Sequence, residues 1–214
     1  MEAKTVKEEA KRIPYGMMNF VAVREDNCYY VDKTRFIEKV EKANKYFFFI
    51  RPRRFGKSLT MSMLRHYYDI NQTDKFDSLY GDLYIGKHPT PNHNKYLIIY
   101  LNFAVVNADL GNYRSALDAH CNTRFNSFSD TYASHLSKGF KDELNKKNGC
   151  VEQLDYIYNE CDRVGLKIYL FIDEYDHFTN HILSDAARLD EYKGETHGTG
   201  YLRTFFDTIK SGTY

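Results

Sequence analysis

The chain has 214 residues, which is enough to bury the core of one α/β domain with an inserted subdomain. It holds 30 Lys and Arg against 29 Asp and Glu, a formal net charge of +1, so overall charge gives no argument for a nucleic-acid-binding or membrane-surface protein. The four cysteines form no CxxC pair, no secretory signal opens the chain, and no apolar run approaches the ~20 residues of a membrane helix, which together favour a cytoplasmic protein with reduced thiols.

The N-terminal region contains short predicted elements. Residues 13–20 hold a proline and a glycine among aromatic and apolar residues, so we expect a turn there. Residues 29–31 are a candidate short strand. Asp32 follows as a candidate N-cap, because its carboxylate can accept hydrogen bonds from the first backbone N–H groups of a helix that runs toward Val40.

The central motif lies in residues 46–70. Five consecutive apolar residues, 46–50, predict a buried strand, and a basic turn follows. Gly56, Lys57 and Ser58 then open a segment in which apolar residues recur at helical spacing. A strand, a loop, GKS and a helix form the context of a phosphate-binding P-loop, since glycine allows close backbone approach and helix N-terminal amides point at the anion. In this interpretation Lys57 reaches the terminal phosphates and the Ser58 hydroxyl binds Mg2+.

The motif departs from the usual pattern at one position. Arg51 stands where the first glycine of a P-loop is expected. Either the loop turns differently or nucleotide binding is weakened. The competing interpretation is a glycine at a helix start, with basic neighbours on the surface.

A second strand and a helical region follow. Residues 96–103 form another apolar run and predict a second buried strand. Apolar residues then recur every three or four positions as far as Leu144, and residues 126–129 are expected to kink or divide this helix. Gly149 is its expected C-cap, and residues 151–164 predict a further amphipathic helix closed by a second glycine, Gly165.

The third predicted strand ends in two carboxylates. Residues 168–172 are apolar, and Asp173 and Glu174 follow them directly. Functional groups in open α/β sheets lie at the carboxyl ends of the strands. One carboxylate there can hold Mg2+ together with Ser58 or through water, and the other can orient an attacking water. The pattern is weak alone, but with the upstream GKS it predicts nucleotide binding.

The end of the chain completes the predicted architecture. Residues 179–189 are expected to be helical, residues 191–200 to form a polar loop, and residues 201–210 to form a short amphipathic helix. The three strand candidates are apolar on both faces, as strands covered by helices on both sides require. The sequence therefore predicts a three-layer α/β fold with a mostly parallel sheet.

Five segments resemble a known family. In order they are IPYGMMNF, YYVDKTRFIEKV, FIRPRRFGKSLTMSML, YLIIYLNF and YLFIDEYD, and they cover nearly the whole chain. They are similar to the bacterial AAA-ATPase-like family, which is related to archaeal P-loop ATPases, and Arg51 looks like that family's own variant of the loop. The resemblance implies one P-loop NTPase-like three-layer sandwich over residues 1–214, with 104–165 as a mainly helical insertion or crossover. It also implies truncation before the sensor strand, and often a following PD-(D/E)XK nuclease-like domain.

The resemblance further implies ATP and Mg2+ as cofactors and assigns the site residues. Asp173 matches a position that binds Mg2+ with Ser58, and Glu174 matches the catalytic base, which acts with Lys57. Tyr30 and Asp32 lie where related ATPases place residues near the adenine. The remaining nucleotide-binding residues are expected in and after the loop, at Arg53, Arg54, Phe55, Gly56, Lys57, Ser58 and Leu59.

Three functions remain open at this point. The first is a Mg2+-dependent ATPase module coupled to an unknown conformational or nucleic-acid-related task. The second is a nucleotide-binding scaffold without turnover, which Arg51 and the expected truncation motivate. The third is the nucleic-acid-binding part of a nuclease-linked protein, motivated by the basic loop, although the acidic cluster around Asp173 lacks the lysine that a PD-(D/E)XK site needs. Nucleic acid is thus expected as a partner through a further C-terminal domain. The oligomeric state does not follow from the sequence.

The loop arginines allow three roles. They could contact the γ-phosphate, pair with Asp173 or Asp176, or face a partner surface. We expect at least one of Arg51, Arg53 and Arg54 to pair with a carboxylate without nucleotide, because clustered cations repel one another.

Overall fold

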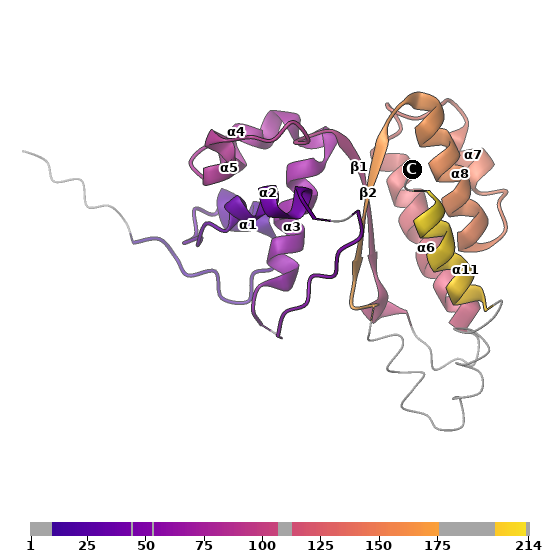
Figure 1. Cartoon of the computed structure of the whole chain (residues 1–214), viewed down its shortest axis with the longest axis horizontal. Helices are drawn as coiled ribbons and strands as arrows, with labels where there is room; N and C mark the ends of the chain where they lie inside the picture. The colour runs from indigo at the N-terminus through magenta and orange to yellow at the C-terminus, as the bar shows by residue number, and fades with distance from the viewer. Residues whose placement is uncertain (1–9, 44, 53, 107–112, 176–199, 213–214) are drawn as a thin grey trace, which may run out of the picture. The chain divides into compact units, whose positions relative to one another are not determined.

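The computed structural model describes residues 10–43, 45–52, 54–106, 113–175 and 200–212 (Figure 1). The chain divides into two compact units, one formed by Met1–Tyr67 and Gln72–Asn94 and the other by Tyr68–Asn71 and Lys95–Tyr214. Each unit has a core of its own and is described by itself. Across the described ranges, no helix is both long enough and apolar enough to cross a membrane.

The first unit, up to its boundary with the second, is helical. Aromatic rings pack in its core: Phe20 stacks on Tyr80 with centroids 5.1 Å apart, and Tyr67 stands edge-on to Tyr80 at 5.5 Å. The first helix begins at Phe20 because the Asn19 side chain accepts hydrogen bonds from the N–H groups of Val21 and Ala22. The elements are α1 (Phe20–Glu25), the 3-10 helix η1 (Thr34–Phe36), α2 (Ile37–Glu41), α3 (Lys57–Tyr68), the 3-10 helix η2 (Ile70–Lys75), α4 (Phe76–Tyr80) and α5 (Tyr84–Lys87).

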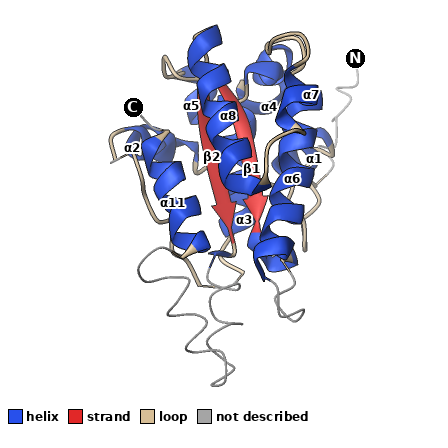
Figure 2. Cartoon of the chain, turned by 90° about the vertical axis from the view of Figure 1, so that its right-hand side faces the viewer, coloured by secondary structure: helices blue, strands red, loops and turns tan. Residues whose placement is uncertain are grey.

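The second unit holds a parallel pair of strands. Its elements are β1 (Tyr96–Asn102), the 3-10 helix η3 (Phe103–Val105), α6 (Tyr113–Thr131), α7 (Phe140–Leu144), α8 (Gly149–Val164), β2 (Lys167–Asp173) and α11 (Tyr201–Ser211). The register runs from Tyr96 opposite Lys167 to Asn102 opposite Asp173. One face of the sheet is covered by α6, α8 and α11, with α8 over the two strands and the other two helices beside it (Figure 2). The alternating residues Leu97, Ile99 and Leu101 are buried in the core of this unit.

The prediction of an α/β fold with parallel strands is confirmed at this level. Residues 96–103 and 168–172 correspond to β1 and β2, within two residues at each end. The predicted helix over 151–164 corresponds to α8, which Gly165 closes in a left-handed conformation with a φ of 71°. The helix predicted over 201–210 corresponds to α11.

The predicted strand at residues 46–50 is wrong. These residues form no strand, and Phe48 and Ile50 are 74% and 80% exposed. A strand needs a neighbour for its backbone N–H and C=O groups, and the sheet in the described part of the chain consists of β1 and β2. Apolar residues favour burial, but a segment becomes a strand only where a neighbouring strand can accept and donate its backbone hydrogen bonds. Residues 29–31, the other short strand candidate, likewise form none.

The predicted helix boundaries between β1 and α8 also need correction. No break occurs at residues 126–129, which lie within α6; the Asn126 amide donates to the Asn122 carbonyl in the same helix and to Asn145 Oδ1 outside it. The helix ends instead at Thr131, before α7. Gly149 is not a C-cap but the first residue of α8, with a φ of 75°. The predicted helix at 179–189 and nearly all of the loop at 191–200 lie outside the described residues.

Candidate functional site

The predicted phosphate loop leads into α3 in the first unit. Gly56 has a φ of 78° and no atom within 4 Å of the position of a Cβ, so glycine is favoured there by backbone conformation rather than by crowding. The helix begins at the next residue, Lys57, and the Thr60 N–H donates to the Gly56 carbonyl at 2.9 Å. Lys57 and Ser58 are half-buried in its first turn. The predicted loop-to-helix transition at GKS is therefore confirmed.

The arginines of the loop do not show the expected carboxylate pairing where they are described. The Arg51 guanidinium carbon lies 5.1 Å from the centre of the Phe49 ring, a cation–π contact. Arg54 is exposed and has a φ of 68°. Within the described ranges neither Arg51 nor Arg54 forms an ion pair. Arg53 and Asp176 lie outside those ranges.

Two further residues assigned to the loop differ in exposure. Phe55 is 62% exposed, whereas Leu59 is half-buried on α3.

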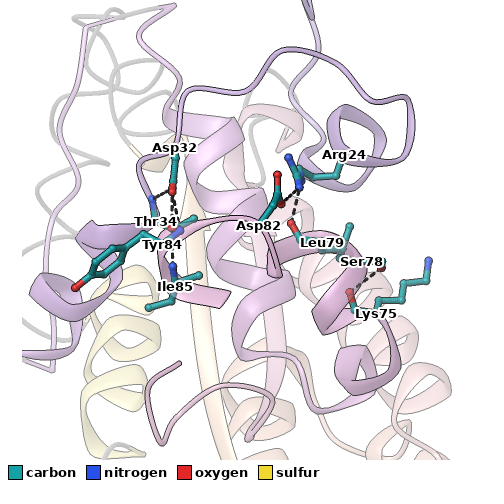
Figure 3. A network of polar contacts seen from close by, with 9 residues as sticks. All are labelled: Arg24, Asp32, Thr34, Lys75, Ser78, Leu79, Asp82, Tyr84 and Ile85. Atoms are coloured by element: carbon teal, nitrogen blue, oxygen red, sulfur yellow. Dashed lines mark hydrogen bonds and ion pairs between the residues drawn. The ribbon is translucent and has the colours of Figure 1, made fainter. Parts of the chain in front are cut away.

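The YVDKT segment is held by a network of polar contacts in the first unit. Asp32 Oδ1 accepts from the Thr34 N–H at 2.8 Å and from the Thr34 hydroxyl at 2.6 Å, and Oδ2 accepts from the Tyr84 N–H at 2.7 Å. The Thr34 hydroxyl in turn accepts from the Ile85 N–H at 3.1 Å. Figure 3 shows Asp32 and Thr34 meeting the start of α5. Asp32 thus holds a local turn and the first N–H of α5, 52 residues further along the chain. The prediction that it is the N-cap of the helix that follows it is wrong, because the N-cap positions of η1 and α2 are Lys33 and Phe36.

The electrostatics of Asp32 follow from these contacts. Partial burial alone would raise the pKa of Asp32, but the hydrogen bonds from Thr34 and Tyr84 outweigh it and lower this pKa below its ordinary value. The carboxylate is therefore the favoured form in the folded protein.

Tyr30 and Arg24 complete the network. The Tyr30 ring stands edge-on to Phe20 with centroids 5.2 Å apart, and burial raises the pKa of its hydroxyl. Arg24 Nε donates to the Leu79 carbonyl at 2.9 Å, and its guanidinium pairs with Asp82 (Figure 3). Tyr30 and Asp32 thus have structural contacts in the protein without nucleotide, and their role near an adenine stays a prediction.

The carboxylate pair lies at the end of β2 in the second unit. Asp173 is 4% exposed and is the last residue of the strand, as predicted. Its Oδ1 accepts from the Glu174 N–H at 3.0 Å, and its Oδ2 accepts from the Tyr100 hydroxyl at 3.3 Å. Glu174 has a φ of 51°, a left-handed conformation that is uncommon for residues other than glycine. Carboxylate oxygens such as those of Asp173 are hard ligands of the kind that Mg2+ accepts.

Comparison with known proteins shows which family the chain belongs to. A family model described as "Predicted AAA-ATPase" matches residues 14–214. The chain belongs to this predicted AAA-ATPase family. A protein of Azotobacter chroococcum mcd 1, described as "Uncharacterized protein in vnfD 5'region", is 41% identical over 63 residues, which are 29% of this chain and 12% of that protein. The chain thus aligns with a small part of that relative. No solved structure matches the chain.

Membership in the predicted AAA-ATPase family suggests an ATPase-like, nucleotide-binding function. The expected site residues of this family member fall in both units: Lys57 and Ser58 in the first, Asp173 and Glu174 in the second. Among the described residues, no group of three or more His, Cys, Asp or Glu side chains could hold a metal ion by itself.

The structure also identifies a residue that sequence reasoning missed. Tyr100 lies on β1 opposite Phe171, two positions before the pair of Asn102 and Asp173. Residues two apart on neighbouring strands share a face and contact diagonally. The proximity of Tyr100 to Asp173 follows only from the parallel register of β1 and β2, because each strand by itself is an ordinary apolar run.

Proposed function

We propose that this chain is the ATP-binding P-loop module of a predicted AAA-ATPase, and that the protein hydrolyses ATP to ADP and phosphate in a Mg2+-dependent reaction. The observation that carries the proposal is the left-handed Gly56 immediately before Lys57 and Ser58 at the start of α3. This geometry gives the GKS sequence the loop-to-helix transition that a phosphate cradle requires.

In this proposal the loop residues bind the triphosphate. The Lys57 ammonium neutralises charge on the terminal phosphates, and the first N–H groups of α3 donate to phosphate oxygens. Arg53 and Arg54 add positive charge to the same loop. The Arg51 side chain, which occupies the position of the usual first glycine, lies over Phe49.

The second unit supplies the carboxylates in this proposal. Asp173 and Ser58 would hold Mg2+, and the ion would supply positive charge to the phosphates of ATP. Glu174 orients the attacking water and accepts its proton. Tyr30 and Asp32 are proposed neighbours of the adenine, in addition to the structural contacts of Asp32 with α5.

The finer architecture belongs to the same proposal. It is a P-loop NTPase-like three-layer sandwich over residues 1–214, in which 104–165 form a mainly helical insertion or crossover. The parallel pairing of β1 and β2, with helices on one face, supports it. Nucleotide is the proposed ligand, and nucleic acid is a proposed partner only through a further domain.

A hydrolysis assay tests this function. Phosphate release is measured with Mg2+ and ATP for the wild type, Glu174→Gln and a control, Glu152→Gln. Glu152 is exposed on α8 and its carboxylate accepts from the Asn148 N–H, a bond that glutamine can retain. We expect Glu174→Gln to abolish phosphate release while ATP stays bound, and the control to leave turnover unchanged. Equal turnover in all three proteins would show that Glu174 merely ends a strand.

A nucleotide-binding scaffold without turnover is the second candidate. The observation that favours it is Arg51 at the position of a P-loop glycine. Mg2+-dependent ATP binding by the wild type, with no phosphate release above background, would support this candidate over the ATPase.

A further inference from the structure

The hydroxyl group of Tyr100 links the two strands at the edge where the carboxylates lie. Tyr100 donates to Asp173 Oδ2 at 3.3 Å. The parallel register places Tyr100 opposite Phe171 and Asp173 opposite Asn102, so the bond crosses the pair diagonally on one face. Both partners are held by strand hydrogen bonds, which fixes the distance between their backbones.

The second oxygen of Asp173 is also engaged. Oδ1 accepts from the N–H of Glu174, whose φ of 51° lies in the left-handed region. A residue other than glycine keeps this conformation only where its surroundings hold it. Asp173 is 4% exposed, so bulk water has little access to its carboxylate. The Tyr100 hydroxyl and the Glu174 amide therefore each restrain one oxygen of this group.

We propose that Tyr100 is a positioning residue for Asp173, acting on its carboxylate and through it on the backbone amide of Glu174, in the group that would hold Mg2+. The proposal rests on the ATPase function proposed above. A carboxylate that is already oriented loses less freedom when it binds a metal, and partners that orient ligands commonly change metal affinity by about 10- to 100-fold.

Two consequences follow from removing the hydroxyl group. In Tyr100→Phe the ring remains in the sheet, but Asp173 Oδ2 loses this donor, so its carboxylate is held less firmly. The Glu174 amide then loses its fixed acceptor, with or without nucleotide present. The affinity for Mg2+ in the nucleotide complex should fall by about 10-fold, because a single orienting partner is lost. ATP binding without Mg2+ should not change.

The control is Tyr96→Phe on the same strand. Tyr96 lies opposite Lys167, at the far end of the register from Asp173, and its ring packs edge-on against Tyr68 and Tyr169. The substitution removes the same atom from the same kind of ring, so it reports what loss of a hydroxyl group does to the sheet alone. Melting temperatures of both variants check that the fold is retained.

The experiment has two measurements on the whole chain. Amide NMR of the nucleotide-free protein follows the chemical shift and exchange rate of the Glu174 N–H. Titration of Mn2+, a paramagnetic stand-in for Mg2+, into the ATP complex gives metal affinity by electron paramagnetic resonance. We expect Tyr100→Phe to shift the Glu174 amide signal, accelerate its exchange and weaken Mn2+ binding about 10-fold, with Tyr96→Phe like the wild type.

The outcomes separate this inference from the function on which it rests. A wild type that binds no ATP with or without metal overturns the proposed function, and with it the role of Tyr100 toward a metal. A wild type that binds ATP and Mn2+, with equal affinity in Tyr100→Phe and an unchanged Glu174 amide, overturns the role of Tyr100 alone. A loss of metal affinity that Tyr96→Phe shares would mark a general effect on the sheet and would also overturn it.

Discussion

The substitution Asp32→Ala tests whether Asp32 serves the fold or a ligand. The carboxylate accepts hydrogen bonds from the N–H and hydroxyl groups of Thr34 and from the N–H of Tyr84. Alanine removes all three acceptor contacts at once. Thr34 is fully buried, so its polar groups have no ready replacement in water. The Tyr84 N–H is exposed, and water can partly replace its partner.

The expected cost is about 2 kcal/mol in the free energy of unfolding. Loss of a capping acceptor typically costs about 1 kcal/mol. Leaving the buried Thr34 groups without their acceptor adds roughly another 1 kcal/mol. The contact between Asp32 and the Tyr84 N–H adds little, because solvent reaches it.

The pH dependence has a defined sign. The pKa of Asp32 is lowered in the folded protein, so its ionised form adds stability that is present above the ordinary unfolded pKa of about 3.9. That stability is lost as the pH falls through the folded pKa. The difference in the free energy of unfolding between the wild type and Asp32→Ala should therefore be largest at neutral pH and should decrease below about pH 4.

Urea unfolding followed by circular dichroism measures this difference. The control is Asp74→Ala, because Asp74 is exposed in the same unit. We expect the control to stay within about 0.5 kcal/mol of the wild type. If Asp32→Ala unfolds like the control but loses ATP affinity, the structural account of Asp32 is refuted and a direct contact with nucleotide is favoured.

Two further predictions concern the second unit. Tyr201→Phe should lower the free energy of unfolding by about 1–2 kcal/mol, because the Tyr201 hydroxyl donates to Asp118 Oδ1 at 2.5 Å and joins α11 to α6. The control is Tyr29→Phe, since Tyr29 is exposed. A urea midpoint of Tyr201→Phe equal to that of the wild type would contradict this prediction. Gly165→Ala should cost about 1 kcal/mol, since the φ of 71° disfavours a Cβ although no atom lies within 4 Å of it. A thermal melt at or above that of the wild type would show that this C-cap tolerates a side chain.

The strands show what apolar runs can and cannot predict. Residues 46–50, 96–102 and 167–173 look alike as sequences, yet only the last two form strands. The difference lies in pairing, because β1 and β2 have each other as neighbours in register. Hydrophobicity identifies a segment that favours burial, whereas pairing depends on residues far away in the chain.

The glycines and the site residues also show that local features can be predicted from the sequence, whereas tertiary contacts cannot. Gly149 and Gly165 both have positive φ, but one opens α8 and the other closes it, so the residue type alone could not assign the end of a helix. Asp32 was predicted as the N-cap of the helix that follows it, but it accepts from Thr34 in a turn before η1, and its bond to Tyr84 depends on tertiary structure. The GKS sequence predicted the start of α3 because its determinants are local: a glycine and the residues that follow it.

The most direct test of the proposed nucleotide site is ATP binding by Lys57→Ala. Isothermal titration with Mg2+ and ATP is run on the wild type, on Lys57→Ala and on Lys42→Ala, an exposed lysine of the same unit that serves as control. We expect heat and saturation for the wild type and the control, and at least about 10-fold weaker binding for Lys57→Ala, since one phosphate contact of about 1.4 kcal/mol corresponds to that factor. Melting temperatures of the three proteins without nucleotide check that the fold is retained. Negligible heat for all three proteins, or equal affinities in all three, would contradict the account.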